Sequence, residues 1–381
     1  PLILVGVVGA LVVCAGLIFV ASQFIHIDLT GDGTEVAVVG SEETPEEPKD
    51  LLPTEDNIPT ATITEAALID PTATIEQEPS LTPEPEFTPT PAATSQGGNA
   101  EIAIVSDRTG LPQVWLINLD GEPYQMLTDA SGGACQPAWS PDGQLLAYIS
   151  PCEENLTQYP GSGIFITNVD GSENYRLMAV PGGDFDPAWS PDGTKLVFTT
   201  LRESNRPQVW LYDFETGEAK SLSNSFTYDY QPAWAPDSFH IAFVTTRSGS
   251  KTEIWVMDIE GNVVGEFSRD FDKYHYEPVW TADGSSILYT QSASSGGIPY
   301  LVIASWDDGA NTRGFDEVRV APNAVGLPMK EADFSPDMQW IIYEGYPDGS
   351  NHDMFLLSLV TLEIEKITGH AATEFDPAWR P

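Results

Sequence analysis

Acidic side chains near the N-terminus have the spacing of a metal-ligand set. Asp28, Thr30 and Asp32 alternate along the segment DLTGDG, and Gly33 permits the sharp turn that such loops make. Calcium prefers oxygen ligands of this kind. The acid that calcium loops carry six residues after the glycine is Val39 here. The segment therefore indicates either a calcium site or a polar turn that ends the preceding apolar run.

The other side chains that commonly carry catalysis show no catalytic arrangement in the sequence. Motifs of serine hydrolases, zinc proteases and nucleotide-binding loops do not occur in a suitable context. The five histidines are scattered without metal-ligand spacing: His26, His240, His275, His352 and His370. We therefore expect a protein that is not an enzyme and that has no cofactor beyond the calcium ion considered above.

Two of the three cysteines are placed to form a disulfide. Cys135 and Cys152 flank a predicted hairpin that turns at residues 140–143, which brings residue 135 nearly opposite residue 150. Such a bond would stabilise the fold by about 3 kcal/mol on the chain-entropy model. It would also indicate an oxidising, extracytoplasmic compartment. The alternative is a pair of free, buried thiols.

One seven-residue motif recurs along the chain and predicts the elements that position these residues. PAWSPDG occurs at 137–143 and 187–193, and altered copies follow at 232–238, 278–284, 332–338 and 377–381. The aromatic positions of the six copies lie 45 to 54 residues apart: Trp139, Trp189, Trp234, Trp280, Phe334 and Trp379. A period of this length, with several short strands per repeat, is typical of a β-propeller.

Each motif copy predicts the first strand and first turn of a four-stranded blade. PAW is extended, and in SPDG the residues Pro191, Asp192 and Gly193 suit the successive positions of a tight turn. The aspartate recurs in five copies: Asp142, Asp192, Asp237, Asp283 and Asp337. We therefore interpret the aspartates as turn residues and the aromatic residues as packing between blades, not as rings of ligands.

The two ends of the repeat region complement each other. Residues 100–128 have the pattern of the second, third and fourth strands of a blade, and residues 375–381 have the pattern of a first strand alone. We predict an all-β, six-bladed propeller over residues 99–381 whose ring is closed by the C-terminal strand. Closure removes sheet edges that would otherwise invite aggregation.

These repeats resemble the TolB-like propeller family, whose WD40-like repeats carry PAWSPDGxxIAFxS, IYVMDxDG and RLT. The resemblance covers about three quarters of the chain. It implies that a protein or glycan ligand binds at propeller loops, and residues 311–331 form a long excursion that we consider a contact surface. Some such propellers accompany peptidase domains and others resemble oligogalacturonate lyases, so a hydrolase or lyase is a minor alternative.

The charge of the chain restricts its partners. Sixteen basic residues stand against 57 acidic ones, for a net charge of −41. Such a surface repels nucleic acid, so we predict no nucleic-acid partner. It also keeps the protein soluble.

The N-terminal segment predicts a means of assembly or anchoring. Residues 1–27 are apolar and predict a hydrophobic α-helix in which Gly6, Ala10 and Cys14 lie one turn apart on one face. The chain starts at Pro1 with this run, which resembles the N-terminal helices of type IV pilin-like proteins. Val5 stands where many of those proteins have glutamate. A single-pass membrane helix is the alternative.

A linker separates the apolar segment from the repeats. Residues 28–40 predict a short turn and strand. Residues 41–98 contain ten Pro, eleven Thr and thirteen acidic residues against one Lys, which predicts an extended chain that reaches about 180 Å. Thr88 and Thr90 in the linker, and Asn155 in the sequon Asn155-Leu156-Thr157, are candidate glycosylation sites.

Together these features favour a structural protein outside the cytoplasm. The leading hypothesis is the subunit of a helical surface filament, whose N-terminal helix packs in the core and whose propeller is displayed outside. Homo-oligomerisation would then use the helix and linker, after an initial membrane stage. The alternative is a single-pass, membrane-anchored propeller that binds proteins or glycans.

Overall fold

The structure, a computed structural model, describes residues 10–14, 17–21, 101–153, 156–178, 182–203, 205–268, 272–307, 314–349 and 351–381. The chain forms two compact units, Pro1–Pro79 and Ser80–Pro381. In the second unit the regular secondary structure of the described ranges consists of strands. The all-β prediction is confirmed.

The first unit contains one described hairpin. β1 (Ala10–Cys14) pairs antiparallel with β2 (Leu17–Ala21). These ten residues are strands where the sequence predicted a helix over 1–27, because an apolar run rich in β-branched residues is compatible with either structure. Within the part of the chain that the structure describes, no helix is long and apolar enough to cross a membrane.

Several predicted features lie outside the described residues. They are the rest of 1–27 including Gly6, the segments 28–40 and 41–98, the candidate calcium ligands Asp28, Thr30 and Asp32, and the candidate glycosylation sites Thr88, Thr90 and Asn155. Ala10 and Cys14 are the two ends of β1.

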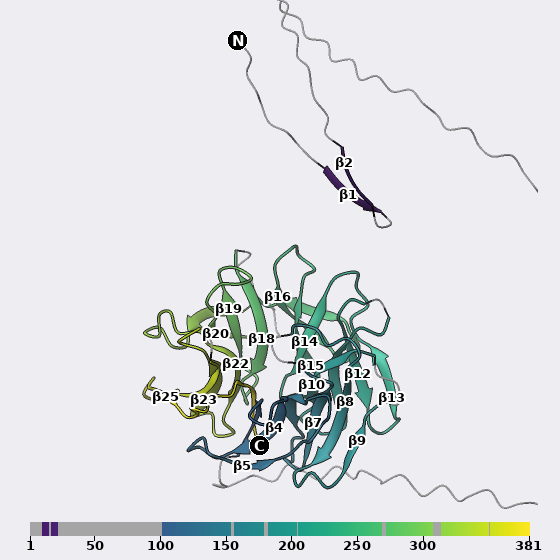
Figure 1. Cartoon of the computed structure of the whole chain (residues 1–381). Coiled ribbons are helices and arrows are strands. Elements are labelled where there is room, and N and C mark those ends of the chain that lie inside the picture. Colours follow the sequence, from purple (N-terminus) through teal and green to yellow (C-terminus); the bar gives the residue numbers. More distant parts are fainter. Residues whose placement is uncertain are drawn as a thin grey trace, which may run out of the picture. The chain divides into compact units, whose positions relative to one another are not determined.

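The second unit consists of six four-stranded antiparallel sheets, the blades (Figure 1). The first blade contains, in sheet order, β26 (Glu374–Trp379), β3 (Ile102–Ser106), β4 (Gln113–Ile117) and β5 (Pro123–Met126). The second contains β6 (Cys135–Trp139), β7 (Leu145–Ser150), β8 (Gly163–Asn168) and β9 (Asn174–Arg176). The third contains β10 (Asp184–Trp189), β11 (Lys195–Thr200), β12 (Gln208–Asp213) and β13 (Glu218–Ser221).

The remaining three blades repeat this order. The fourth contains β14 (Asp229–Trp234), β15 (His240–Thr245), β16 (Glu253–Asp258) and β17 (Val263–Glu266). The fifth contains β18 (Tyr274–Trp280), β19 (Ser286–Ser292), β20 (Tyr300–Ser305) and β21 (Phe315–Arg319). The sixth contains β22 (Lys330–Phe334), β23 (Trp340–Gly345), β24 (Asp353–Ser358) and β25 (Ile364–Lys366).

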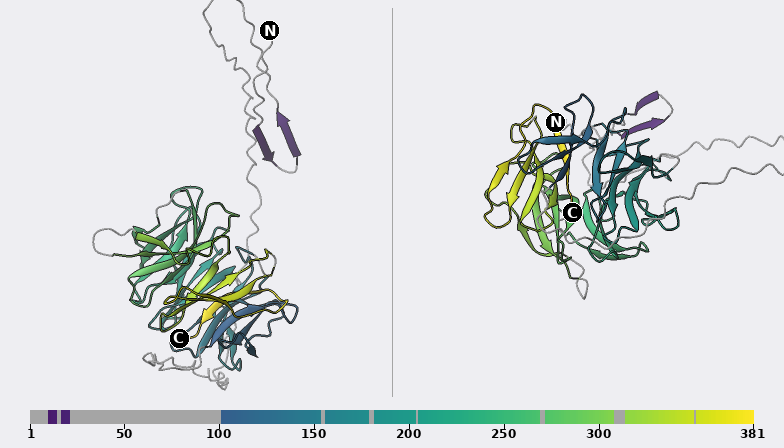
Figure 2. Two further views of the ribbon diagram at one scale, coloured as in Figure 1. Left: turned by 90° about the vertical axis from the view of Figure 1, so that its left-hand side faces the viewer. Right: turned by 90° about the horizontal axis from the view of Figure 1, so that it is seen from below.

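The C-terminal strand closes the ring as predicted. β26 pairs antiparallel with β3, with Trp379 opposite Ile102 and Glu374 opposite Ser106. It also contacts β22 of the sixth blade and β6 of the second, so the first strands of the blades follow one another in a closed cycle. The axis of the propeller runs through the middle of this cycle of strands, and Figure 2 shows the blades around it. The six-bladed propeller is confirmed.

The middle strands of the blades supply the hydrophobic core. All five residues of β3, IAIVS, are buried, and β24 is buried along its whole length. Strands covered on both faces by neighbouring blades need apolar residues at successive positions, not at alternate ones. The core therefore forms layers between blades, and each blade is held by its neighbours.

The fifth blade corrects one expectation. Residues 311–331 were expected to form a long contact loop, but Phe315–Arg319 is β21, the outer strand of this blade. Val320, Ala321 and Met329 are then buried in the core cluster of the fifth and sixth blades. The prediction of a continuous loop was wrong for Phe315–Arg319, because the outer strand is separated from β20 by a longer connection than in the other blades. Residues 320–329 have no regular secondary structure, as expected for a loop.

Candidate functional site

One polar residue from each blade lies at the axis of the propeller. Each stands three positions before the aromatic residue of the repeated motif, in the first strand of its blade. We call these six residues the axial ring: Gln136, Asp186, Gln231, Glu277, Glu331 and Asp376. They are half-buried.

The backbone at the axial ring is in an unusual conformation in every blade. The first strand of each blade has a register shift at this place. The six residues have φ between 48° and 54°, in the left-handed region that non-glycine residues rarely adopt. Such a conformation costs about 1 kcal/mol or more per residue and persists only where the surroundings enforce it.

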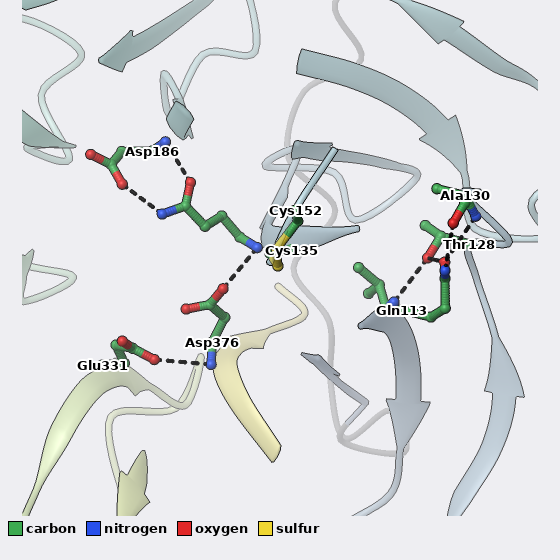
Figure 3. The surroundings of a disulfide bond; sticks show 10 residues. Gln113, Thr128, Ala130, Cys135, Cys152, Asp186, Glu331 and Asp376 are labelled. Carbon is green, nitrogen blue, oxygen red and sulfur yellow. Dashed lines mark hydrogen bonds between the residues drawn. A yellow bond between two sulfur atoms is a disulfide. The ribbon is translucent and has the colours of Figure 1, made fainter. Parts of the chain in front are cut away.

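A closed circuit of hydrogen bonds enforces it. Each of the six backbone N–H groups donates to the ring side chain of the preceding blade, over 2.6 to 3.1 Å. Figure 3 shows three of these links, which run from Asp186 through Gln136 to Asp376 and on to Glu331. The circuit joins all six blades, including the one completed by the C-terminal strand.

The part of the ring in blades two to four alternates amide and carboxylate. The Gln136 side chain donates to Asp186 Oδ1 over 2.8 Å and accepts the N–H of Asp186. Thr199 donates to the other oxygen of Asp186 over 2.8 Å. Burial raises the pKa of Asp186 to about 6 although these donors act in the opposite direction.

The part of the ring in blades five, six and one places three carboxyl groups in succession. Burial and the neighbouring charge of Glu331 raise the pKa of Glu277 to about 7 and that of Asp376 well above its usual value. Burial alone would raise the pKa of Glu331 too. The Lys330 ammonium, 2.8 Å away, outweighs burial and holds that pKa far below its usual value.

Lys330 links the ring to a second carboxyl group farther out. Its ammonium is 3.0 Å from Oε1 of Glu344, a fully buried residue that also contacts His352 Nδ1. Oε2 of Glu344 has no hydrogen-bond partner among the described residues. Burial raises the pKa of Glu344 well above its usual value, because an ionised carboxylate at this place would be poorly solvated.

This arrangement can bind and share protons, and it locks the blades together. Each ring side chain accepts a backbone N–H through one of its oxygen atoms, and this bond fixes the position of the side chain. Across the described ranges, no group of three or more His, Cys, Asp or Glu side chains has the arrangement of a metal site.

The residues singled out in the sequence lie elsewhere in each blade. The indole N–H groups of Trp139, Trp189, Trp234 and Trp280 each donate to a carbonyl of the preceding blade over 3.1 to 3.2 Å. Phe334 and Trp379 are buried at the equivalent positions. The aromatic residues thus pack between blades.

The repeated aspartates lie in the turn after the first strand. Oδ1 of Asp142, Asp192, Asp283 and Asp337 accepts the hydroxyl of the serine or threonine two residues earlier, over 2.6 to 2.7 Å. Asp237 instead contacts His240 Nδ1 over 2.6 Å, since Ala235 has no hydroxyl. None of the five belongs to the axial ring.

Cys135 and Cys152 form a disulfide, with their Cα atoms 5.8 Å apart (Figure 3). Cys135 directly precedes Gln136 of the axial ring. In the first, third and fourth blades the corresponding junction is held by ion pairs: Glu374 with Arg108, Asp184 with Arg202 at 2.5 Å, and Asp229 with Arg247 at 2.7 Å. The second blade therefore has a covalent link where three other blades have an ionic one.

The axial ring was not predicted from the sequence, although the sequence contains a signal for it. Every motif copy has a polar residue three positions before the aromatic residue, and five of the six directly precede proline. The motif is defined by residue types that most copies share, whereas the ring position varies among Gln, Asp and Glu.

The fold and the axial ring define a six-bladed β-propeller closed by its C-terminal strand. Residues 116–325, more than half of the chain, match the family described as "TolB beta propeller domain". The chain belongs to this family, and the predicted TolB-like propeller is confirmed.

Solved structures show the same fold at low sequence identity. TolB from Acinetobacter baumannii is 21% identical with a TM-score of 0.59, over 74% of this chain and 68% of that one. A putative TolB from Agrobacterium tumefaciens is 15% identical with a TM-score of 0.54, over 74% and 98%. Hydrazine synthase from Kuenenia stuttgartiensis is 14% identical with a TM-score of 0.59, over 75% and 47%. A comparison with curated proteins gives no match.

Proposed function

We propose that this protein is a non-enzymatic display protein that presents its propeller outside the cytoplasm. The axial ring is the observation that supports this most. Its six side chains, which would be the natural reactive groups of a propeller channel, each accept a backbone N–H from the next blade. Their role in this proposal is to keep a closed, rigid body.

The location in the proposal rests on two features. The Cys135–Cys152 disulfide is typical of proteins in oxidising compartments. The acidic, Pro- and Thr-rich composition of residues 41–98 is typical of an extended stalk that holds a folded body away from its attachment point.

The attachment in the proposal is the apolar N-terminal segment. We propose that residues 1–27 join copies of the chain into a surface filament, with the propellers on the outside. This part rests on the charge-free composition of residues 1–25, which favours removal from water by other copies or by lipid.

Negative-stain microscopy of the full-length protein, purified from native membranes and from sheared cell surfaces, tests the proposal. Regular fibres with peripheral globular density would support the filament. Dispersed particles that require detergent would replace it with the membrane-anchored alternative. Manganese or zinc retained stoichiometrically by the purified propeller would contradict the non-enzymatic assignment.

A further inference from the structure

A hollow of about 250 Å³ lies between the fourth and fifth blades, away from the axial ring. The indole rings of Trp280 and Trp306 and the imidazole of His240 line it, together with three acidic side chains: Asp237, Asp283 and Asp307. Nothing in the axial circuit uses these residues. Because every blade repeats the same plan, the other blades serve as internal controls for what is special here.

Several residues at this hollow differ from the equivalent residues of the other blades. Trp306 follows β20, where the other blades have a smaller residue: Leu119, Val169, Phe214, Ile259 and Leu359. In the third blade, Phe214 lies flat on Trp189, with the ring planes 3° apart and the centroids 4.9 Å apart, so the two faces cover each other. In the fifth blade, Trp306 is perpendicular to Trp280, at 87° and 5.8 Å. The two indoles therefore form a corner.

The neighbouring blade changes at the same place. Ala235 replaces the turn serine, so Asp237 contacts the His240 ring, and this ring lies 6.5 Å from Trp306 at 62°. The His240 ring thus lies beside the corner that the two indoles form. Perpendicular indole faces suit a compact cation, since each indole face is negative, whereas a flat platform would suit a sugar ring.

Two acidic residues of the hollow, Asp283 and Asp237, are stabilised in their charged form. The hydrogen bonds that Asp283 accepts from described residues all reach Oδ1, and those from Ser285 and Thr281 lower its pKa. Partial burial would raise the pKa of Asp237, but hydrogen bonds from His240 outweigh it and lower that pKa. The net charge of −41 adds a long-range attraction for cations.

We propose that the hollow between blades four and five binds an organic cation, an ammonium or guanidinium group, in the corner beside the indoles of Trp280 and Trp306, with Asp283 as its counter-ion. The cation is either a small molecule or the side chain of a lysine or arginine on a partner protein. This inference goes beyond the display role and holds whichever assembly carries the propeller.

Titration of the full-length protein at constant ionic strength tests the proposal. The probes are tetramethylammonium, for a small-molecule source, and Nα-acetylarginine methylamide and Nα-acetyllysine methylamide, for a partner side chain. The readout is the indole N–H signals in nitrogen-15 spectra of tryptophan-labelled protein, assigned with the W280F and W306L variants. We expect a saturable shift of the Trp280 and Trp306 signals, and the tighter probe identifies the source.

The variants distinguish specific binding in the hollow from unspecific attraction of cations to the negatively charged protein. Asp283→Asn should weaken binding at least about fivefold, and Trp306→Leu, which installs the residue of the sixth blade, about tenfold. Asp192→Asn, the same turn in the third blade, should leave binding unchanged, with thermal melting to check folding of all three variants. The proposal is overturned if no cation gives a saturable shift or if D192N weakens binding as much as D283N. It is equally overturned if glucose shifts the two signals and the cations do not.

Discussion

The two halves of the axial ring hold the same backbone conformation with different side chains. In blades two to four, the side chains of Gln136, Asp186 and Gln231 alternate, and an amide separates each carboxyl group from the next. In blades five, six and one, Glu277, Glu331 and Asp376 follow one another directly. Both halves accept the same backbone N–H groups in the same left-handed conformation. We call them the amide half and the carboxyl half.

The difference shows that the hydrogen-bond circuit needs an acceptor at each ring position, whether or not that acceptor is charged. An amide oxygen and a carboxylate oxygen can both accept a backbone N–H. Three successive carboxyl groups, however, require a cation and bound protons, because like charges at this separation raise one another's pKa. Lys330 supplies the cation, and the raised pKa values of Glu277 and Asp376 favour a bound proton on these two groups.

Removal of Lys330 should have the largest effect. Lys330→Met leaves Glu331 and the buried Glu344 without their ammonium partner, so we expect a loss of about 3 kcal/mol at pH 8. Lys330 lowers the pKa of Glu331 below its ordinary value of 4.5, so this contribution is complete at pH 5 and is lost only as pH falls below about 4.5. Denaturant unfolding at pH 3 and pH 8 measures the loss and its pH dependence. Lys220→Met, at an exposed ion pair with Glu260, is the control and should cost under about 0.5 kcal/mol.

Loss of the disulfide should be nearly as costly but insensitive to pH. The Cys135→Ala, Cys152→Ala double variant removes a cross-link over 17 residues beside the amide half, worth about 3 kcal/mol on the chain-entropy model. Equilibrium unfolding from pH 3 to pH 8 should give a constant difference from the oxidised wild type. A loss of unfolding free energy that grows with pH, as in the Lys330 variant, would mean that the disulfide acts through the charges of the axial ring.

An added carboxyl group should give the amide half the like-charge repulsion of the carboxyl half without a lysine to offset it. Gln231→Glu retains an acceptor for the N–H of Glu277 but places a charge between Asp186 and Glu277. We expect a loss of about 2 kcal/mol at pH 8 that shrinks toward pH 4, where the carboxyl groups are protonated. Gln144→Glu, in an exposed turn, adds the same charge elsewhere. Equal losses in both variants would attribute the effect to net charge.

The reverse substitution should give the smallest change, and a gain. The pKa of Glu277 rises from 4.5 to about 7 on folding, so the folded protein binds an extra proton in this window and loses stability as pH rises through it. Glu277→Gln should therefore stabilise by about 1 kcal/mol at pH 8 and be neutral near pH 4. Thermal unfolding across this range measures the gain. A loss at pH 8 would show that Thr290 and the Glu331 N–H require the carboxylate. Glu365→Gln, on an exposed strand, controls for net charge.

The repeated motif was enough to predict the blades and their closure. Copies such as PAWSPDG at 137–143 and the incomplete blades at both ends fix the strand order, because hydrophobic periodicity and turn chemistry are local. The turn role of Asp192 could be predicted for the same reason. The outer strand Phe315–Arg319 was missed, since its sequence FDEVR carries little apolar pattern and a long connection precedes it.

The sequence by itself determined the six blades, the joining of the chain ends and the abundance of negative charge, since each depends on residues close together in the chain or on composition. Only the tertiary structure decided which polar residues meet at the axis and which aromatic rings meet between blades four and five. The hydrogen bond from Gln136 to Asp376 joins residues 240 positions apart. Trp306 and His240 likewise come from different blades. Such contacts depend on how the blades pack against one another in the closed ring. A local sequence pattern does not encode which distant residues this packing brings together.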